Sequence, residues 1–200
     1  MNETKAIRGR PRAFDMDKAL DAALDLFWRK GYEGTSIADL TKAMGINPPS
    51  LYAAFGGKET LFHQALDRYE AAHAVFWNEA LAAPSAYEAM KKLLESTADS
   101  LSDKKNPRGC LIVQGALAGG DECDPVRQEL AARRNKSVTM IRERLARAKR
   151  EGDLHKDADP ASLARYVATV IHGMAVQAVS GVSRPELRRV AETALKAWPN

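Results

Sequence analysis

The chain has 200 residues, of which 45% are hydrophobic and 28% are charged, and its net charge is +4. This composition is ordinary for a globular protein of one or two domains. No apolar run approaches the roughly 18 residues that span a bilayer, and the first fifteen residues lack the apolar core of a secretory signal. We therefore expect a cytoplasmic protein without a membrane partner, with Cys110 and Cys123 as reduced thiols.

Basic residues gather in two segments. The first holds Lys5, Arg8, Arg10 and Arg12 against a single acid, Glu3. Such clustering either marks contact with phosphate groups or only solubilises the chain. The second cluster, which we interpret as a solvated helix face, consists of Arg142, Arg144, Arg147, Lys149 and Arg150.

Helical periodicity dominates the chain, and no segment is typical of a strand. Apolar residues spaced i, i+3, i+4 and i+7 from Leu20 to Phe27 predict a helix that is capped by Asp15 or Asp17 and ends at Gly31. A second helix is expected from a cap at Thr35 or Ser36 to residue 45, and a third from 47 to 56. Further helices are expected at about 58–83, 85–103, 110–118, 126–151, 161–181 and 185–198.

The sharp turn at Gly45, between two short helices, is typical of a helix-turn-helix. In that motif the second helix enters the major groove of DNA, while neighbouring groups hold phosphates. Leu51 and Phe55 are expected in the core. The donors expected near the DNA backbone are Ser36, Ser50, Tyr52 and Lys58.

The segment GYEGTSIADLTKAMGINPPSLYAAFGGKETLF resembles the N-terminal signature of the TetR family, and the likeness runs from about residue 12 to 69. It implies that residues 47–54 form the recognition helix, that Tyr52 contacts DNA and that Lys58 pairs with phosphate. Because Pro48 has no side-chain donor, base reading would rely on apolar contact, Ser50 and DNA shape. The predicted DNA-binding residues are the arm residues Arg8, Arg10 and Arg12, together with Ser36, Asn47, Pro48, Pro49, Ser50, Tyr52, Ala53, Ala54 and Lys58.

The segment RGCLIVQGALA resembles a stretch that one broad TetR subgroup places beside its ligand cavity. The resemblance implies an all-α protein with a DNA-binding domain at 12–72 and a larger effector-binding and dimerisation domain at 73–200. The last two helices would then form a four-helix interface between two copies. Small residues at Gly173, Ala175, Ala178 and Gly181 would allow close helix approach, although these helices could instead cover the core of a monomer.

These features together predict a transcriptional repressor that binds a palindromic operator as a homodimer and is released by a small organic effector. Neither a cofactor nor a metal is expected. The partners are double-stranded operator DNA, a second copy of the chain and the effector. Polar or aromatic residues among apolar neighbours are candidate effector contacts: Phe76, Trp77, Tyr87, Met90, Cys110, Gln114, Tyr166, His172 and Gln177.

Three alternatives remain at this stage. Cys110 follows Arg108 at an expected helix start, where its thiol pKa would be lowered and suit redox or electrophile sensing, or it is simply a small buried residue. Glu70 and His73 have the spacing of half a di-metal enzyme site, but without a second pair they are expected on a solvated face. The basic segment 142–150 could instead dock on a membrane or an acidic partner.

Overall fold

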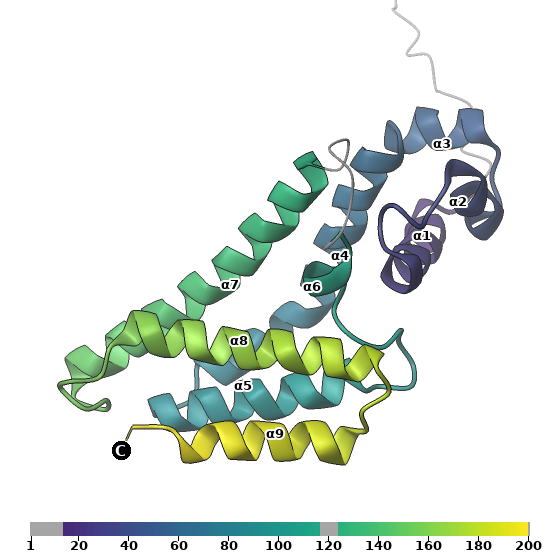
Figure 1. Cartoon of the computed structure of the whole chain (residues 1–200). Helices are drawn as coiled ribbons and strands as arrows, with labels where there is room; N and C mark the ends of the chain where they lie inside the picture. The colour runs from purple at the N-terminus through teal and green to yellow at the C-terminus, as the bar shows by residue number, and fades with distance from the viewer. Residues whose placement is uncertain (1–13, 117–123, 200) are drawn as a thin grey trace, which may run out of the picture.

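In the computed structural model, which describes residues 14–116 and 124–199, the chain is all-helical and contains no strand, as predicted. Three short helices lie at one end of the molecule, and α5, α8 and α9 lie together at the other (Figure 1). The long helices α4 and α7 run between the two ends (Figure 1). Among the described helices, none is long and apolar enough to cross a membrane.

Side-chain caps define the N-terminal helices α1 (Met16–Lys30), α2 (Ile37–Met44) and α3 (Pro48–Phe55). Of the alternative caps, the structure selects Asp15, which accepts from the backbone of α1, and Ser36, which forms a reciprocal capping box with Asp39. Thr35 is buried and donates to the Gly31 carbonyl at 2.7 Å instead. Gly45 ends α2 in the left-handed region with φ 66°, which glycine adopts without strain.

The remaining helices follow the predicted order. They are α4 (Lys58–Leu81), α5 (Ala86–Leu101), α6 (Leu111–Gln114), α7 (Asp124–Glu151), α8 (Pro160–Val179) and α9 (Arg184–Lys196). The expected helix at 110–118 is shorter, because α6 ends at Gln114, and residues 117–118 lie outside the described residues.

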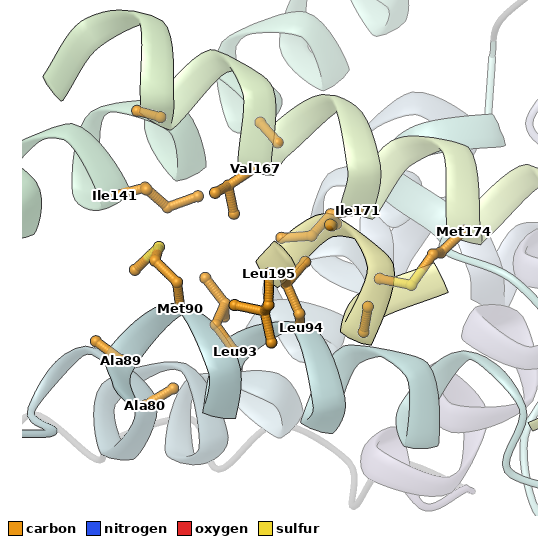
Figure 2. Packing of buried hydrophobic residues seen from close by; sticks show 14 of the residues in the cluster. Ala80, Ala89, Met90, Leu93, Leu94, Ile141, Val167, Ile171, Met174 and Leu195 are labelled. Carbon is orange, nitrogen blue, oxygen red and sulfur yellow. The ribbon is translucent and has the colours of Figure 1, made fainter. Parts of the chain in front are cut away.

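The larger of two hydrophobic cores lies between α5, α7, α8 and α9 (Figure 2). Leu93 and Leu94 of α5 point toward Ile171 of α8 and Leu195 of α9, and all four side chains are buried. Each such side chain contributes about 1.5–3 kcal/mol through removal of apolar surface from water. This packing fixes α5, α7, α8 and α9 relative to one another.

The smaller core joins α1, α2 and α3 to the first half of α4, with Phe27, Leu51, Phe55 and Phe62 at its centre. It also includes Leu111 of α6 and side chains from the start of α7. Because α4 continues without a break through residues 72 and 73, the predicted domain division at that point stays a prediction.

The predicted solvated face at 142–150 is wrong for Arg144, whose side chain is buried. Its Nε donates to the Leu81 carbonyl at 3.0 Å, and its Nη2 donates to the carbonyls of Ala83 and Pro84 at 2.9 and 3.3 Å. These carbonyls end α4 and the turn after it, where helical partners are lacking. Arg144 therefore fixes the end of α4 against α7.

Replacing Arg144 with Ala should lower the free energy of unfolding by about 2–4 kcal/mol, since buried carbonyls lose their donors. Urea denaturation followed by circular dichroism measures the change. Arg142→Ala, at an exposed position of the same helix, is the matched control and should change stability by less than about 0.5 kcal/mol. Equal effects of the two variants would contradict the assigned role.

Candidate DNA-binding surface and ligand cavity

Helix α3 is amphipathic in the way a recognition helix requires. Leu51 and Phe55 are buried, as predicted, and pack in the smaller core. Tyr52 is 54% exposed and Ala53 is exposed. The Tyr52 ring therefore lies on the outward face of α3, opposite the face that packs in the smaller core.

Two predicted contact residues serve as helix caps in this structure. The Ser36 hydroxyl accepts from the Asp39 N–H at 3.0 Å, and the Asn47 side chain accepts from the Ser50 N–H at 2.9 Å. Both residues are exposed, as are Pro48 and Pro49, whereas Ser50 and Ala54 are half-buried. All of these residues lie in or next to α2 and α3, and their DNA contacts stay predictions.

Lys58 begins α4 beside this surface. Its Nζ lies 4.2 Å from the centre of the Tyr32 ring, where a cation is attracted by the ring face. The ring holds the ammonium group near the N-terminus of α4, whose free N–H groups also favour an anion. Arg8, Arg10 and Arg12 lie outside the described residues.

A cavity of about 220 Å³ opens between α4, α5, α7 and α8, and the segment around α6 closes one side of it. Four of the nine residues proposed as effector contacts line this cavity, namely Phe76, Trp77, Cys110 and His172. Sequence reasoning missed several other lining residues, including Tyr69, His73, Arg134 and Met140. Tyr69 is buried, and no local signal in the sequence distinguishes Arg134 from its neighbours.

The other five candidates lie away from the cavity. Met90 is fully buried in the larger core, and Tyr87 and Gln177 are exposed. The Tyr166 hydroxyl donates to the Ala194 carbonyl of α9 at 3.1 Å, and Gln114 approaches the Arg108 carbonyl at 3.4 Å. The structure therefore offers no common ligand site for these five.

Aromatic rings connect the cavity wall to α1. Trp28 of α1 meets Tyr69 edge to face at 4.8 Å, and the Tyr69 ring lies 4.2 Å from the His73 ring. The His73 ring packs in turn against the Phe76 ring, and the Phe76 ring lies next to that of Trp77. Such pairs stabilise beyond their buried area. A ligand that moves Tyr69 or His73 would therefore disturb a residue of the DNA-binding end.

The interpretation of Glu70 and His73 as a solvated face is wrong, because both line the cavity. His73 Nδ1 lies 2.7 Å from the Tyr69 carbonyl, which can only accept, so Nδ1 carries a proton. Burial lowers the His73 pKa, against the effect of this hydrogen bond. Within residues 14–116 and 124–199, no group of three or more potential metal ligands is found.

Cys110 does not have the lowered thiol pKa that its place in the sequence suggested. Burial raises the pKa, and this effect outweighs hydrogen bonding from Tyr69 and from the N–H groups of Val113 and Ile112. The half-buried side chain lines the cavity, so the thiol is held neutral beside any bound molecule.

Two hydrogen bonds join the segment around α6 to the end of α1. The buried Trp28 Nε1 donates to the Gly109 carbonyl at 3.2 Å, just before α6. The Tyr32 N–H donates to the Gly115 carbonyl at 2.8 Å, just after α6. Between these anchors, Cys110 and Val113 line the cavity. The same short segment therefore contacts both the cavity and the DNA-binding helices.

Comparison with known proteins decides the family. Residues 19–65 match the model for bacterial regulatory proteins of the tetR family, and residues 86–198 match the tetracyclin repressor-like C-terminal domain. The chain belongs to the TetR family. The sequence-based prediction of this family and of an all-α helix-turn-helix regulator is thus confirmed.

Relatives of this TetR protein match along nearly its whole length. The repressor ComR of Escherichia coli K12 is 34% identical over 98% of this chain and 94% of its own. The repressor BdcR of the same organism is 30% identical over 96% and 92%. These matches make the chain a helix-turn-helix transcriptional repressor, a regulator and not an enzyme.

A solved structure of the TetR regulator CifR is similar in fold and sequence. This cysteine mutant, complexed with 26-base-pair double-strand operator DNA, is 49% identical, has a TM-score of 0.92 and covers 96% of this chain and 100% of its own.

Because burial disfavours its thiolate, Cys110 of this TetR protein should react slowly with iodoacetamide at pH 7.4. We expect a rate about tenfold or more below that of a free cysteine, rising only above the ordinary thiol pKa of about 8.5. Mass spectrometry of a Cys123→Ser variant measures the reaction at Cys110 alone. A rate that is already maximal below pH 8 would show that the thiol is activated.

Proposed function

We propose that this chain is a homodimeric repressor that binds a palindromic operator through α3 and is released by a small organic effector. It would act in the cytoplasm, where bacterial DNA lies. The observation that carries the proposal is the likeness, over nearly the full chain, to CifR complexed with operator DNA. An exposed α3 and a cavity in the other half of the chain supply the two sites that such a regulator needs.

The exposed part of α3 carries no charged residue. Direct readout there would come from apolar contacts of Tyr52 and Ala53, with Pro48 and Pro49 facing outward at the first turn. Positive charge comes from outside the helix, at Lys58 and in the arm that holds Arg8, Arg10 and Arg12. We therefore assign register and affinity to these cations and sequence preference to α3.

Dimerisation is supported by exposed apolar side chains on the last two helices. Val176 and Val179 of α8 are 48% and 53% exposed, and Val190 of α9 is 42% exposed. Beside them, a Cβ built at Gly173 would have no neighbour within 4 Å. A second copy packed here would bury these groups and present two α3 helices to successive turns of DNA.

The segment around α6 provides the coupling between the two sites. An effector that contacts Cys110 or Val113 can shift this segment, and the bonds from Trp28 and Tyr32 would carry the shift to α1. Release follows only if the effector binds the shifted arrangement more tightly than the DNA-bound one.

Lys58→Ala should weaken operator binding and reduce the salt dependence of log K by about 1 per protomer, since one phosphate contact is lost from each. Tyr52→Ala should weaken binding by roughly tenfold through lost apolar contact, with little change in the salt slope. Fluorescence anisotropy with an operator selected from random oligonucleotides, measured at several salt concentrations, separates the two effects.

The control for this experiment is Lys92→Ala, which removes an exposed charge from α5 in the opposite end of the molecule. It should leave affinity and salt slope unchanged. If the Lys58 and Tyr52 variants bind like the Lys92 variant while all three melt like the parent protein, α3 is not the DNA-binding helix.

Trp28→Phe tests the coupling, because it removes the donor to Gly109 and keeps an aromatic ring at the same place. A lost hydrogen bond of about 1–1.5 kcal/mol should loosen α1 and weaken operator affinity by roughly tenfold. Trp198→Phe, at another buried tryptophan near the end of α9, should have no effect on affinity. If the two variants bind the operator equally well and keep their melting temperature, Trp28 does not take part in the coupling.

A further inference from the structure

We propose that the effector of this repressor is an organic anion, a carboxylate on an apolar body, and that Arg134 binds its carboxylate. This inference rests on the proposed function, because it names the class of molecule that the cavity takes. The charged side chains in the cavity wall are not balanced. Arg134 and Lys136 supply cations, whereas Glu70 is the single carboxylate among the described lining residues.

Glu70 does not neutralise these cations, because it is bound elsewhere. Its carboxylate accepts from Arg133 Nη1 at 2.5 Å. Arg133 also donates to Asp67 and to Glu129, each at 2.7 Å, so its guanidinium is surrounded by three acids that lie on α4 and α7.

Arg134, the next residue of α7, has a different environment. Its Nη1 donates to the Ile112 carbonyl at 2.7 Å, and within the described residues no carboxylate pairs with it. Burial is the main influence on the pKa of Arg134, and it lowers that pKa. The guanidinium charge is therefore partly removed from water, without a counter-ion among the described residues. A half-buried charge of this kind is stabilised by a bound anion, and a guanidinium can hold a carboxylate with two parallel hydrogen bonds.

Groups from three parts of the fold meet at Arg134. Burial lowers the pKa of His172 in α8, and the nearby charge of Arg134 lowers it further. Cys110, which lies just before α6, is close enough to interact with the Arg134 charge as well. Arg134, His172 and Cys110 all line the cavity, so the Arg134 side chain lies at the edge of the space that an effector would occupy. His172 is therefore neutral near pH 7 and can donate one further hydrogen bond to an anion.

The rest of the wall favours an apolar body. Phe76, Trp77, Met140 and Ile171 line the cavity, and a molecule that filled it would contact mostly carbon atoms. At about 220 Å³ the cavity lies below the usual range of about 300–1,000 Å³, so the molecule is small. An inorganic ion would leave these apolar groups without contacts, which favours an aromatic or short aliphatic acid.

Binding at Arg134 also connects to the proposed release. The guanidinium donates to Ile112, which lies in α6, and α6 is anchored to α1 at both of its ends. A carboxylate that draws Arg134 into the cavity competes with the Ile112 carbonyl. The segment that contacts the DNA-binding helices would then lose one of its holding bonds.

The test compares matched pairs of small molecules, 4-phenylbutyrate with 4-phenylbutyramide and octanoate with octanamide, by isothermal titration calorimetry on the full-length dimer. At least one carboxylate should bind tenfold or more tightly than its amide. Arg134→Gln should abolish this preference, and Arg134→Lys should restore part of it. Arg142→Gln removes an equal charge from an exposed position of α7 and should keep the preference.

NMR of the His172 ring gives a second readout, which a purely structural role of Arg134 would not produce. The bound carboxylate should raise the His172 pKa, because a nearby negative charge favours the imidazolium form, and the amide should not. Amides that bind as tightly as the acids, a preference that survives Arg134→Gln, or no binding by any acid of the panel would overturn the proposal.

Operator anisotropy with the same compounds separates this inference from the proposed function. If a neutral amide releases the operator as well as the acid does, the effector is not an anion, but the proposal of an effector-released repressor still holds. Acid binding that depends on Arg134 but leaves operator affinity unchanged would support the ligand class and contradict effector release.

Discussion

The two ends of this repressor are joined by the docking of one short segment against the end of α1. Trp28 and Tyr32 donate to the carbonyls of Gly109 and Gly115, on either side of α6. Both donors belong to the region that orients α2 and α3, and both acceptors flank the residues that close the cavity. Without these bonds the cavity would still exist, but α6 would no longer be tied to the end of α1.

The segment around α6 packs against both hydrophobic cores of the molecule. Leu111 of α6 is fully buried in the smaller core, whereas Val113 packs in the larger one, so α6 contributes to both. Tyr69 adds a second route, because its ring touches Trp28 on one side and the cavity on the other. Close-packed groups of this kind move between discrete arrangements and do not deform gradually.

Much of the fold could be predicted because its information is local. Caps such as Asp15 and Asn47, and the glycine at 45, define helix ends within a few residues, and periodic apolar positions identify the buried faces. The exposure of Tyr52 next to the buried Leu51 follows from the same spacing. The division of α3 into a buried and an exposed face was therefore accessible from the sequence, while its DNA contacts stay predictions.

The cavity was less predictable because it depends on distances between helices that are remote in the chain. Arg133 and Arg134 are adjacent and chemically identical, yet one meets three carboxylates and the other meets a carbonyl and an apolar cavity. Arg144 looked like one of several surface cations and instead fixes the end of α4. Tyr87 and Gln177 had suitable chemistry but point to solvent, which no local pattern reveals.

The closeness of the two backbones at this junction also limits how the protein can vary. A Cβ at Gly31 would lie 3.0 Å from the Gly115 oxygen, and one at Gly115 would lie 2.6 Å from the Leu111 oxygen. A side chain at Gly31 would push α1 away from the segment around α6, and one at Gly115 would distort that segment itself. Selections for loss of repression should thus recover substitutions at these two positions in protein that still folds.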